Sequence, residues 1–236
     1  MSADEVLYLL GDVVAVRSIE RLNANVRSVH GHYRPGGIRA ETYKAIVEDI
    51  LTAVRSERKI CVALYGHPGV FAQPAHEAIV RARAEGYSAR MLPAVSAEDC
   101  LFADLGVDPG ATGCQSYEAT DFLMRQRRID TSAALVLWQV GVVGNLTYAP
   151  EGDASRLPVL VDYLCTLYPR EHEVALYEAS PFPGCDPIVK RPILAHVTRS
   201  KVSPATTMYI PPLKTRPIDV EMMRRLELTS SAGGNA

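Results

Sequence analysis

The stretch that decides the fold is KICVALYGHPGVFAQPAHEAIVRARAEG, residues 59–86. Its first seven residues, 59–65, form a continuous apolar run, which is typical of a strand buried on both faces of a parallel sheet. The run breaks at the Gly-His-Pro-Gly loop of residues 66–69, and Pro74 suits the first turn of a helix that Gly86 ends. A strand, a glycine-containing loop and a helix in this order predict a ligand-binding loop at the carboxyl end of a sheet strand.

The loop itself favours contact between a ligand and the backbone. Gly66 and Gly69 allow backbone conformations that other residues avoid, and Pro68 stiffens the turn; a tight turn without a ligand is the alternative for this loop taken alone. Similar strand ends occur in LPAVSAED, residues 92–99, and in LWQVGVVGN, residues 137–145. Together they predict a pocket of backbone and small groups suited to an adenosine-type cofactor. The sequence has no GxxxxGK[ST] and no GxGxxG, which disfavours a P-loop and a dinucleotide fingerprint.

The order of elements predicts an α/β fold. Strands expected at 4–10, 59–65 and 88–95 alternate with helices at 40–57, 74–86 and 96–106, and short crossovers of this kind imply a mainly parallel sheet between helices. A turn-rich segment, GVDPGATG, marks the expected domain boundary. We therefore expect an N-terminal α/β domain at 4–111, a second α/β domain with a mixed sheet at 112–228, and a disordered tail at 229–236.

Composition excludes several classes of protein. A net charge of −2 over 236 residues gives no reason to expect nucleic-acid binding, and the basic group at 125–128 reads as a solvated face. Five cysteines without a CxxC pair and six scattered histidines predict reduced, buried thiols and no metal site. No apolar stretch approaches the ~20 residues that span a bilayer, and the start MSADEV is unlike a signal peptide. The sequence therefore predicts a cytoplasmic protein that does not bind membranes.

The motif ALYGHPGVF, followed by MLPAVSAEDCLFADL and CQSYEATDFL, resembles the tetrapyrrole methylase superfamily of S-adenosylmethionine-dependent methyltransferases. Within it, the chain is most similar to the borosin peptide backbone N-methyltransferases, from about residue 4 to about residue 227. The resemblance implies two α/β domains with a cofactor cleft between them, a homodimer, and methylation of backbone amide nitrogens of a peptide, as in biosynthesis of ribosomal peptide natural products.

The resemblance also carries site residues onto this chain. The expected contacts of S-adenosylmethionine are Tyr65, His67, Val70, Ala97, Gln139, Ala179, Thr206 and Thr207. The expected catalytic residues lie in HGHYRPGGIRAETY and are Tyr33, Arg39 and Tyr43. His30 stands where some members have a further tyrosine.

These residue types suit amide methylation. The amide nitrogen must lose its proton while negative charge builds on the carbonyl oxygen. A tyrosinate is a suitable base if a nearby cation, Arg39, lowers its pKa, and Arg39 with a tyrosine hydroxyl also suits stabilisation of the oxyanion. From periodicity alone Tyr43 reads as a core residue, Arg39 as a residue near a helix start, and His67 as a satisfied loop histidine.

Two departures from the family pattern shape the expectation. The usual first strand and its glycine-rich loop are missing, because residues 3–10 match the second strand. The clasp and the Val/Ile-rich core peptide of fused members are also missing, so the substrate peptide is expected in trans. The alternatives are a methyltransferase acting on a tetrapyrrole or other small molecule, and a truncated, inactive binding homologue.

Overall fold

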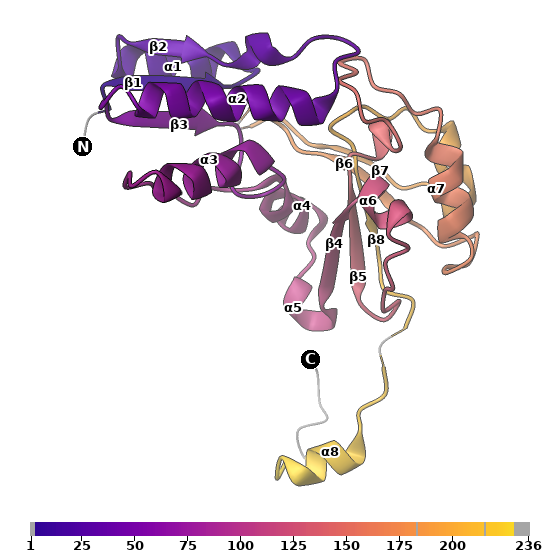
Figure 1. Ribbon diagram of the computed structural model, residues 1–236. Coiled ribbons are helices and arrows are strands. Elements are labelled where there is room, and N and C mark those ends of the chain that lie inside the picture. The colour runs from indigo at the N-terminus through magenta and orange to yellow at the C-terminus, as the bar shows by residue number, and fades with distance from the viewer. Residues whose placement is uncertain (1–2, 183, 215, 229–236) are drawn as a thin grey trace. The chain divides into compact units, whose positions relative to one another are not determined.

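The computed structural model of the chain describes residues 3–182, 184–214 and 216–228 (Figure 1). It divides into two compact units. Unit 1 comprises Met1–Ala103, Asn145–Glu151 and Ala179–Asp186, and unit 2 comprises Asp104–Gly144, Gly152–Glu178 and Pro187–Ala236. The sequence-based division at residues 111–112 stays a prediction about domains. The expected disordered tail, residues 229–236, lies outside the described residues.

Unit 1 is built on a three-stranded parallel sheet in the order β2-β1-β3, with β1 at Glu5–Leu9, β2 at Val26–Ser28 and β3 at Ile60–Leu64. Helix α1, Val13–Leu22, lies behind the sheet in Figure 1, and α2, Arg39–Val54, lies in front of it. The remaining elements are the 3-10 turn η1 at His30–His32, helix α3 at Gln73–Ala84 and the start of α4 at Ala97–Leu105.

The core of unit 1 follows from the spacing of apolar residues on α2. Ile46, Val47, Ile50 and Leu51 are buried against Leu7 of the central strand, as the helical periodicity predicts. Because the three strands are parallel, the segments that follow β2 and β3 both begin at the same edge of the sheet. This places the residues after Ser28 and after Leu64 at the same end of the sheet, on either side of β1.

Three expectations, about β3, about residues 88–95 and about the cysteines, are wrong. Strand β3 is not buried on both faces, because it lies at an edge of the sheet, its other residues are half-buried and Cys61 on it is exposed. Residues 88–95 form no strand, because they run as irregular chain from the end of α3 to α4. The five thiols are free, as expected, but Cys61 and Cys185 are exposed and the other three are only half-buried.

Unit 2 contains a five-stranded mixed sheet in the order β4-β5-β8-β6-β7, which confirms the expected mixed character. Only β4 and β5 pair in parallel, and the other neighbours are antiparallel. The strands are β4 Cys114–Glu118, β5 Ala134–Trp138, β6 Ala175–Glu178, β7 Ile188–Lys190 and β8 Thr207–Ile210. The helical elements are α5 Pro109–Thr112, α6 Ala119–Met124, η2 Val140–Val142, α7 Leu157–Leu164, η3 Leu194–Arg199 and α8 Val220–Arg225. The α/β class is therefore confirmed.

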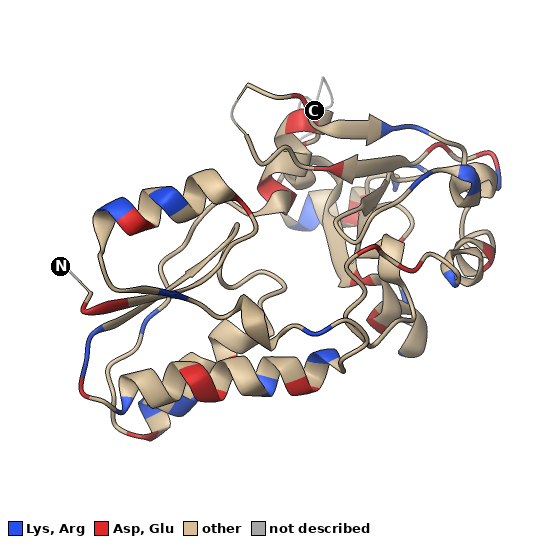
Figure 2. Cartoon of the chain, turned by 90° about the horizontal axis from the view of Figure 1, so that it is seen from above, with Lys and Arg blue, Asp and Glu red and all other residues tan. Residues whose placement is uncertain are grey.

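The charged residues of both signs are spread along the helices (Figure 2). In the basic group at 125–128, Arg125 and Arg127 both pair with Asp121, at 2.6 and 2.9 Å. The single Asp121 carboxylate therefore offsets one of these two positive charges. No helix among the described residues is both long enough and apolar enough to cross a bilayer.

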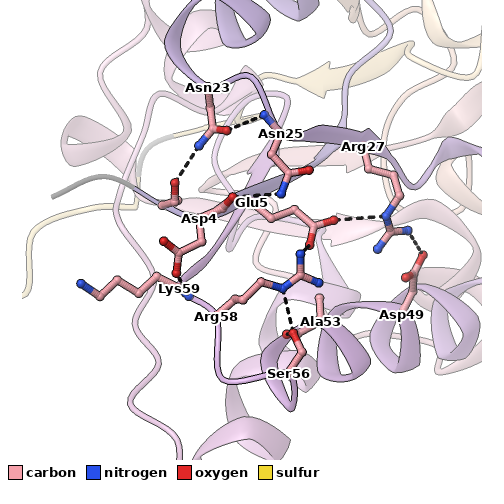
Figure 3. Close-up of polar contacts among 11 residues, drawn as sticks. Asp4, Glu5, Asn23, Asn25, Arg27, Asp49, Ala53, Ser56, Arg58 and Lys59 are labelled. Carbon is pink, nitrogen blue, oxygen red and sulfur yellow. Dashed lines mark hydrogen bonds and ion pairs between the residues drawn. The ribbon is translucent and has the colours of Figure 1, made fainter.

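A buried carboxylate fastens the start of the sheet (Figure 3). Glu5, on the central strand, exposes 7% of its side chain and receives Arg27 from β2 at 3.3 Å and Arg58 from the α2–β3 turn at 3.0 Å. Arg27 continues to Asp49 of α2 at 2.8 Å. The network therefore joins two strands to the helix that carries Arg39.

Replacing Glu5 with glutamine is expected to lower the free energy of unfolding by about 1–2 kcal/mol, because the ion pairs are lost while both guanidiniums stay hydrated. Urea unfolding measures the change. The control is Glu20→Gln on the exposed face of α1, for which we expect no more than about 0.5 kcal/mol. Equal effects of the two substitutions would show that the pairs contribute nothing.

Candidate active site

Four phenols gather within unit 1. Tyr33 follows η1, Tyr43 lies on the first turns of α2, Tyr65 follows β3, and Tyr148 comes from the returning segment Asn145–Glu151. The ring centroid of Tyr33 lies 4.9 Å from that of Tyr148 and 6.5 Å from that of Tyr43. His30 joins the cluster, with its ring 5.5 Å from Tyr33. The structure thus brings together Tyr33, Tyr43 and His30, and Arg39 acts on Tyr33 from close by. These are the four residues that the sequence predicts as catalytic.

A short antiparallel ribbon holds this cluster. The Gly36 N–H donates to the Tyr148 carbonyl, the Tyr148 N–H donates to the Gly37 carbonyl at 2.8 Å, and the Arg39 N–H donates to the Leu146 carbonyl at 3.0 Å. The ribbon lies directly before α2, so it fixes both Tyr148 and the first residue of the helix.

Arg39 is held at its guanidinium as well as at its backbone. Its Nη2 donates to the carbonyl of Asn145 at 2.5 Å. Asn145 itself is set by a turn in which its Oδ1 accepts from the Thr147 N–H at 2.8 Å and from the Thr147 hydroxyl at 2.7 Å. A cation at a helix start gains nothing from the helix dipole. The hydrogen bonds of its guanidinium and its backbone therefore hold Arg39 at this position.

The Tyr33 phenol is the most perturbed group of the cluster. Burial raises its pKa well above the usual value of about 10, repulsion from Tyr43, Tyr65 and Tyr148 adds to the rise, and Arg39 opposes it. Arg39 therefore does not bring the pKa of Tyr33 below its usual value, because desolvation outweighs the cation. The choice between a tyrosinate and a paired tyrosine as the base stays a prediction. At neutral pH Tyr33 is a neutral hydrogen-bond donor.

Tyr43 and Tyr65 border the cluster without being buried. Tyr43 sits at the edge of the α2 stripe and is half-buried, with its ring toward Tyr33, so it is not one of the core residues of the helix. Tyr65 is 73% exposed. Surrounding protein atoms and the Tyr43 and Tyr148 phenols raise the pKa of Tyr65. Because water reaches this side chain, solvent screens these effects more strongly at Tyr65 than at Tyr33.

The loop after β3 has the backbone that its glycines predict. Gly66 adopts φ +64°, and Phe71 adopts φ +52°, a left-handed conformation that is uncommon outside glycine. His67 Nδ1 accepts from the Gly69 N–H at 2.9 Å, so this histidine shapes its own loop. A Cβ at Gly69 would lie 2.5 Å from the sulfur of Met91, so a larger residue there would have to displace this flexible side chain.

The start of α4 forms the expected capping box. The Ser96 N–H and hydroxyl donate to the Asp99 carboxylate at 2.6 and 2.7 Å, and the Asp99 N–H donates to the Ser96 hydroxyl at 3.2 Å. These bonds hold the pKa of Asp99 below its usual range. Ala97, the first helical residue, is exposed.

The candidate residues of unit 2 lie at one end of its sheet, where β5 ends and β8 begins. Gln139 follows β5, Thr207 begins β8, and β6 pairs with β8 through Tyr177 and Thr207. Gln139 has a left-handed backbone, with φ +59°. Ala179 follows directly on β6 and belongs to unit 1.

Thr206 is bound within unit 2. Its hydroxyl donates to Glu178 at 2.5 Å and accepts from the Ser203 N–H at 2.7 Å. Its carbonyl accepts from the Val140 N–H at 3.2 Å. These bonds fix the turn before β8. A contact between Thr206 and a cofactor stays a prediction, as do the contacts of the other seven residues.

Each unit has a strand end of the kind that can bind a nucleoside through main-chain groups. In unit 1 Gly66 has a left-handed backbone and Ala97 is exposed, and in unit 2 Gln139 has a left-handed backbone. Among the described residues no group of three His, Cys, Asp or Glu side chains is placed to hold a metal ion.

The family model of tetrapyrrole (corrin/porphyrin) methylases matches residues 1–180. The chain belongs to the tetrapyrrole methylase family. Members of this family are S-adenosylmethionine-dependent methyltransferases. The fold expected from the resemblance, an α/β tetrapyrrole methylase fold, is confirmed by this match.

Two relatives of this tetrapyrrole methylase are fused proteins. The chain is 39% identical over 236 residues to a methyltransferase/cyclic peptide gymnopeptides precursor from Gymnopus fusipes, covering 98% of this chain and 56% of the relative. It is 39% identical over 219 residues to a methyltransferase/type I borosin cyclic peptide precursor from Coprinopsis marcescibilis, covering 89% of this chain and 56% of the relative. The chain therefore spans little more than half the length of these relatives.

A solved structure agrees on the fold. Uroporphyrin-III C-methyltransferase from Thermus thermophilus, complexed with S-adenosylhomocysteine, superposes with a TM-score of 0.56 at 16% identity, covering 89% of this chain and 86% of that one. At this identity the likeness concerns the fold alone.

Sequence reasoning missed Tyr148 and Asn145. Asn145 is the last residue of the strand-end stretch 137–145 and Tyr148 follows it, and neither lies in a catalytic motif. The only signal is the order Gly144-Asn145, which indicates a turn after a buried strand and hence a chain that reverses toward another element.

Proposed function

We propose that this tetrapyrrole methylase transfers methyl groups from S-adenosylmethionine to backbone amide nitrogens of a peptide supplied in trans. The observation that supports this most directly is the cluster of four phenols and one guanidinium in unit 1. Such groups are suited to removing an amide proton and to holding negative charge on a carbonyl oxygen. The peptide-precursor relatives favour the same substrate class.

In this proposal the cofactor supplies an electrophilic methyl group on a sulfonium. The residues proposed to bind it through backbone and small side chains are Tyr65, His67, Val70, Ala97, Gln139, Ala179, Thr206 and Thr207. The stiffness of the Gly66–Phe71 turn and of the capped α4 start limits the cofactor to one orientation, which in-line transfer needs.

The oxygen side of the amide is assigned to Tyr33 and Arg39. The buried Tyr33 phenol is neutral, so it can donate its hydroxyl proton in a hydrogen bond to the carbonyl oxygen. Arg39 is close enough to act on the pKa of Tyr33, and its guanidinium is oriented by Asn145. Two donors on one oxygen stabilise the imidate that forms as the nitrogen loses its proton.

The nitrogen side is assigned to Tyr43. As a phenolate it takes the N–H proton, the nitrogen then accepts the methyl group, and the products are an N-methyl amide and S-adenosylhomocysteine, with the proton passed on to solvent. Environments that keep one phenol protonated beside another that ionises are a common way to separate acid and base roles. His30, whose ring contacts Tyr33, is assigned a supporting role beside it.

Mass spectrometry of the reaction products tests the function. The protein is incubated with S-adenosylmethionine and either a soluble synthetic peptide with a Val-Ile-rich core or uroporphyrinogen III. We expect mass gains in steps of one methyl group on the peptide, with fragmentation placing them on backbone nitrogens. Methylation of the tetrapyrrole alone would replace this proposal with the small-molecule alternative.

Calorimetry with S-adenosylhomocysteine separates an enzyme from an inactive binding homologue. We expect saturable heat from binding, and no heat together with no product would favour the inactive homologue. We also propose a cytoplasmic homodimer, and light scattering of the purified protein measures the oligomeric state.

A further inference from the structure

The segment that returns to unit 1 contributes more than chain connectivity. Tyr148 makes the shortest ring contact of Tyr33 among the described aromatic pairs, at 4.9 Å with the planes tilted by 58°. It also meets the His30 ring edge-on at 6.4 Å. Two of the proposed catalytic side chains therefore pack on this one residue.

The same segment orients Arg39. Asn145 offers its carbonyl to the guanidinium at 2.5 Å, and the turn made with Thr147 fixes the direction of that carbonyl. The ribbon bonds between Gly37 and Tyr148 and between Arg39 and Leu146 keep the two ends of the segment in register. A shift of the segment would thus move Tyr33 and Arg39 together.

We propose that Tyr148 is a positioning residue of the methyl-acceptor site, and that the segment Asn145–Tyr148 sets the spacing between Tyr33 and Arg39. The inference rests on the proposed function, which requires both groups to reach one carbonyl oxygen. A displacement of about 1 Å in such a pair costs as much as 10²-fold in rate. Because the contact is made by the ring, phenylalanine preserves it and leucine removes it.

The kinetic test compares Tyr148→Phe and Tyr148→Leu with matched controls, Tyr87→Phe and Tyr87→Leu. Tyr87 is another half-buried tyrosine that packs on the core of unit 1. With the synthetic Val-Ile-rich peptide, we expect Tyr148→Leu to lower kcat by about 10- to 100-fold at nearly unchanged KM and unchanged affinity for S-adenosylhomocysteine. Tyr148→Phe should stay within about 3-fold of the parent protein.

Two kinetic results would overturn the inference. One is Tyr148→Leu behaving like Tyr87→Leu, which would make Tyr148 an ordinary packing residue. The other is equal loss in Tyr148→Phe and Tyr148→Leu, which would assign the role to the hydroxyl. A second variant, Thr147→Val, removes the hydroxyl bond to Asn145 and should lower kcat by about 3- to 10-fold, through Arg39.

A readout without substrate keeps this inference separate from the proposed function. In the free protein, NMR follows the Nε–H of Arg39 and the ring protons of Tyr33. We expect both to shift in Tyr148→Leu and to stay in place in Tyr87→Leu. If the parent protein methylates no peptide, the function fails; unchanged Arg39 and Tyr33 signals in Tyr148→Leu would then overturn the positioning role as well.

Discussion

Replacing Arg39 with alanine is expected to lower kcat/KM for peptide methylation by about 10²- to 10³-fold, the usual cost of removing one oxyanion donor. The loss arises because the guanidinium, held by the Asn145 carbonyl, is one of the two donors proposed for the imidate oxygen. Steady-state kinetics with the synthetic peptide measures it. The dissociation constant of S-adenosylhomocysteine should stay within about 3-fold, since less than 1 kcal/mol of cofactor binding is expected to depend on Arg39.

The matched control is Arg34→Ala, an exposed arginine on the same loop. It should leave the rate within about 2-fold, because a surface substitution of this kind has little effect on the fold. Arg39→Lys keeps the charge but not the planar fork, and we expect it to recover only part of the activity. Equal losses of turnover and cofactor binding in Arg39→Ala would make Arg39 a structural residue.

The pH dependence of the rate is expected to separate the two phenols. If a phenol of the cluster acts as the general base, log(kcat/KM) is expected to rise with pH. Tyr43→Phe should remove this rise and lower the rate by about 10²-fold or more. Tyr33→Phe should keep the rise while lowering the rate by about 10²-fold, because it removes only a hydrogen-bond donor.

The raised pKa of Tyr33 also limits the pH range in which rates can be measured on the folded protein. Its pKa is raised in the folded state, so the unfolded chain releases this proton first, near pH 10. Stability is unaffected at lower pH and falls as the pH rises beyond that point. Rates should therefore be measured up to about pH 10, with circular dichroism at each pH. Loss of the rising limb in Tyr33→Phe and not in Tyr43→Phe would exchange the two assignments.

The sequence predicts those parts of the fold that depend on local periodicity. The apolar stripe of α2, the Pro74 start of α3 and the Ser96–Asp99 box are all present, because each is determined by neighbours along the chain. The position of β3 at a sheet edge is not local. An apolar run looks alike in the middle and at the edge of a sheet, and only strand order distinguishes the two.

In the candidate site, too, some features depend on neighbouring residues and others depend on the folded chain. Tyr33, Arg39 and Tyr43 lie within eleven residues and their resemblance to a family motif placed them correctly in one cluster. Tyr148 is more than a hundred residues away, and its role depends on a ribbon pairing that no spacing rule gives. The neutral state of Tyr33 is not visible in the sequence either, because it follows from burial, which is a property of the folded chain.

The interleaved layout of the units has a consequence for biosynthesis. The antiparallel ribbon pairs residues 36–39 with the segment 145–151. A ribosome therefore translates β4, α6 and β5 of unit 2 before this ribbon can form. A nascent chain that ends before residue 145 lacks the Asn145 carbonyl that binds Arg39, even if the rest of its amino-terminal half has folded. The phenol cluster and its ribbon are thus complete only after translation has passed the second unit's first strands, and no single cut of the gene separates unit 1 from unit 2.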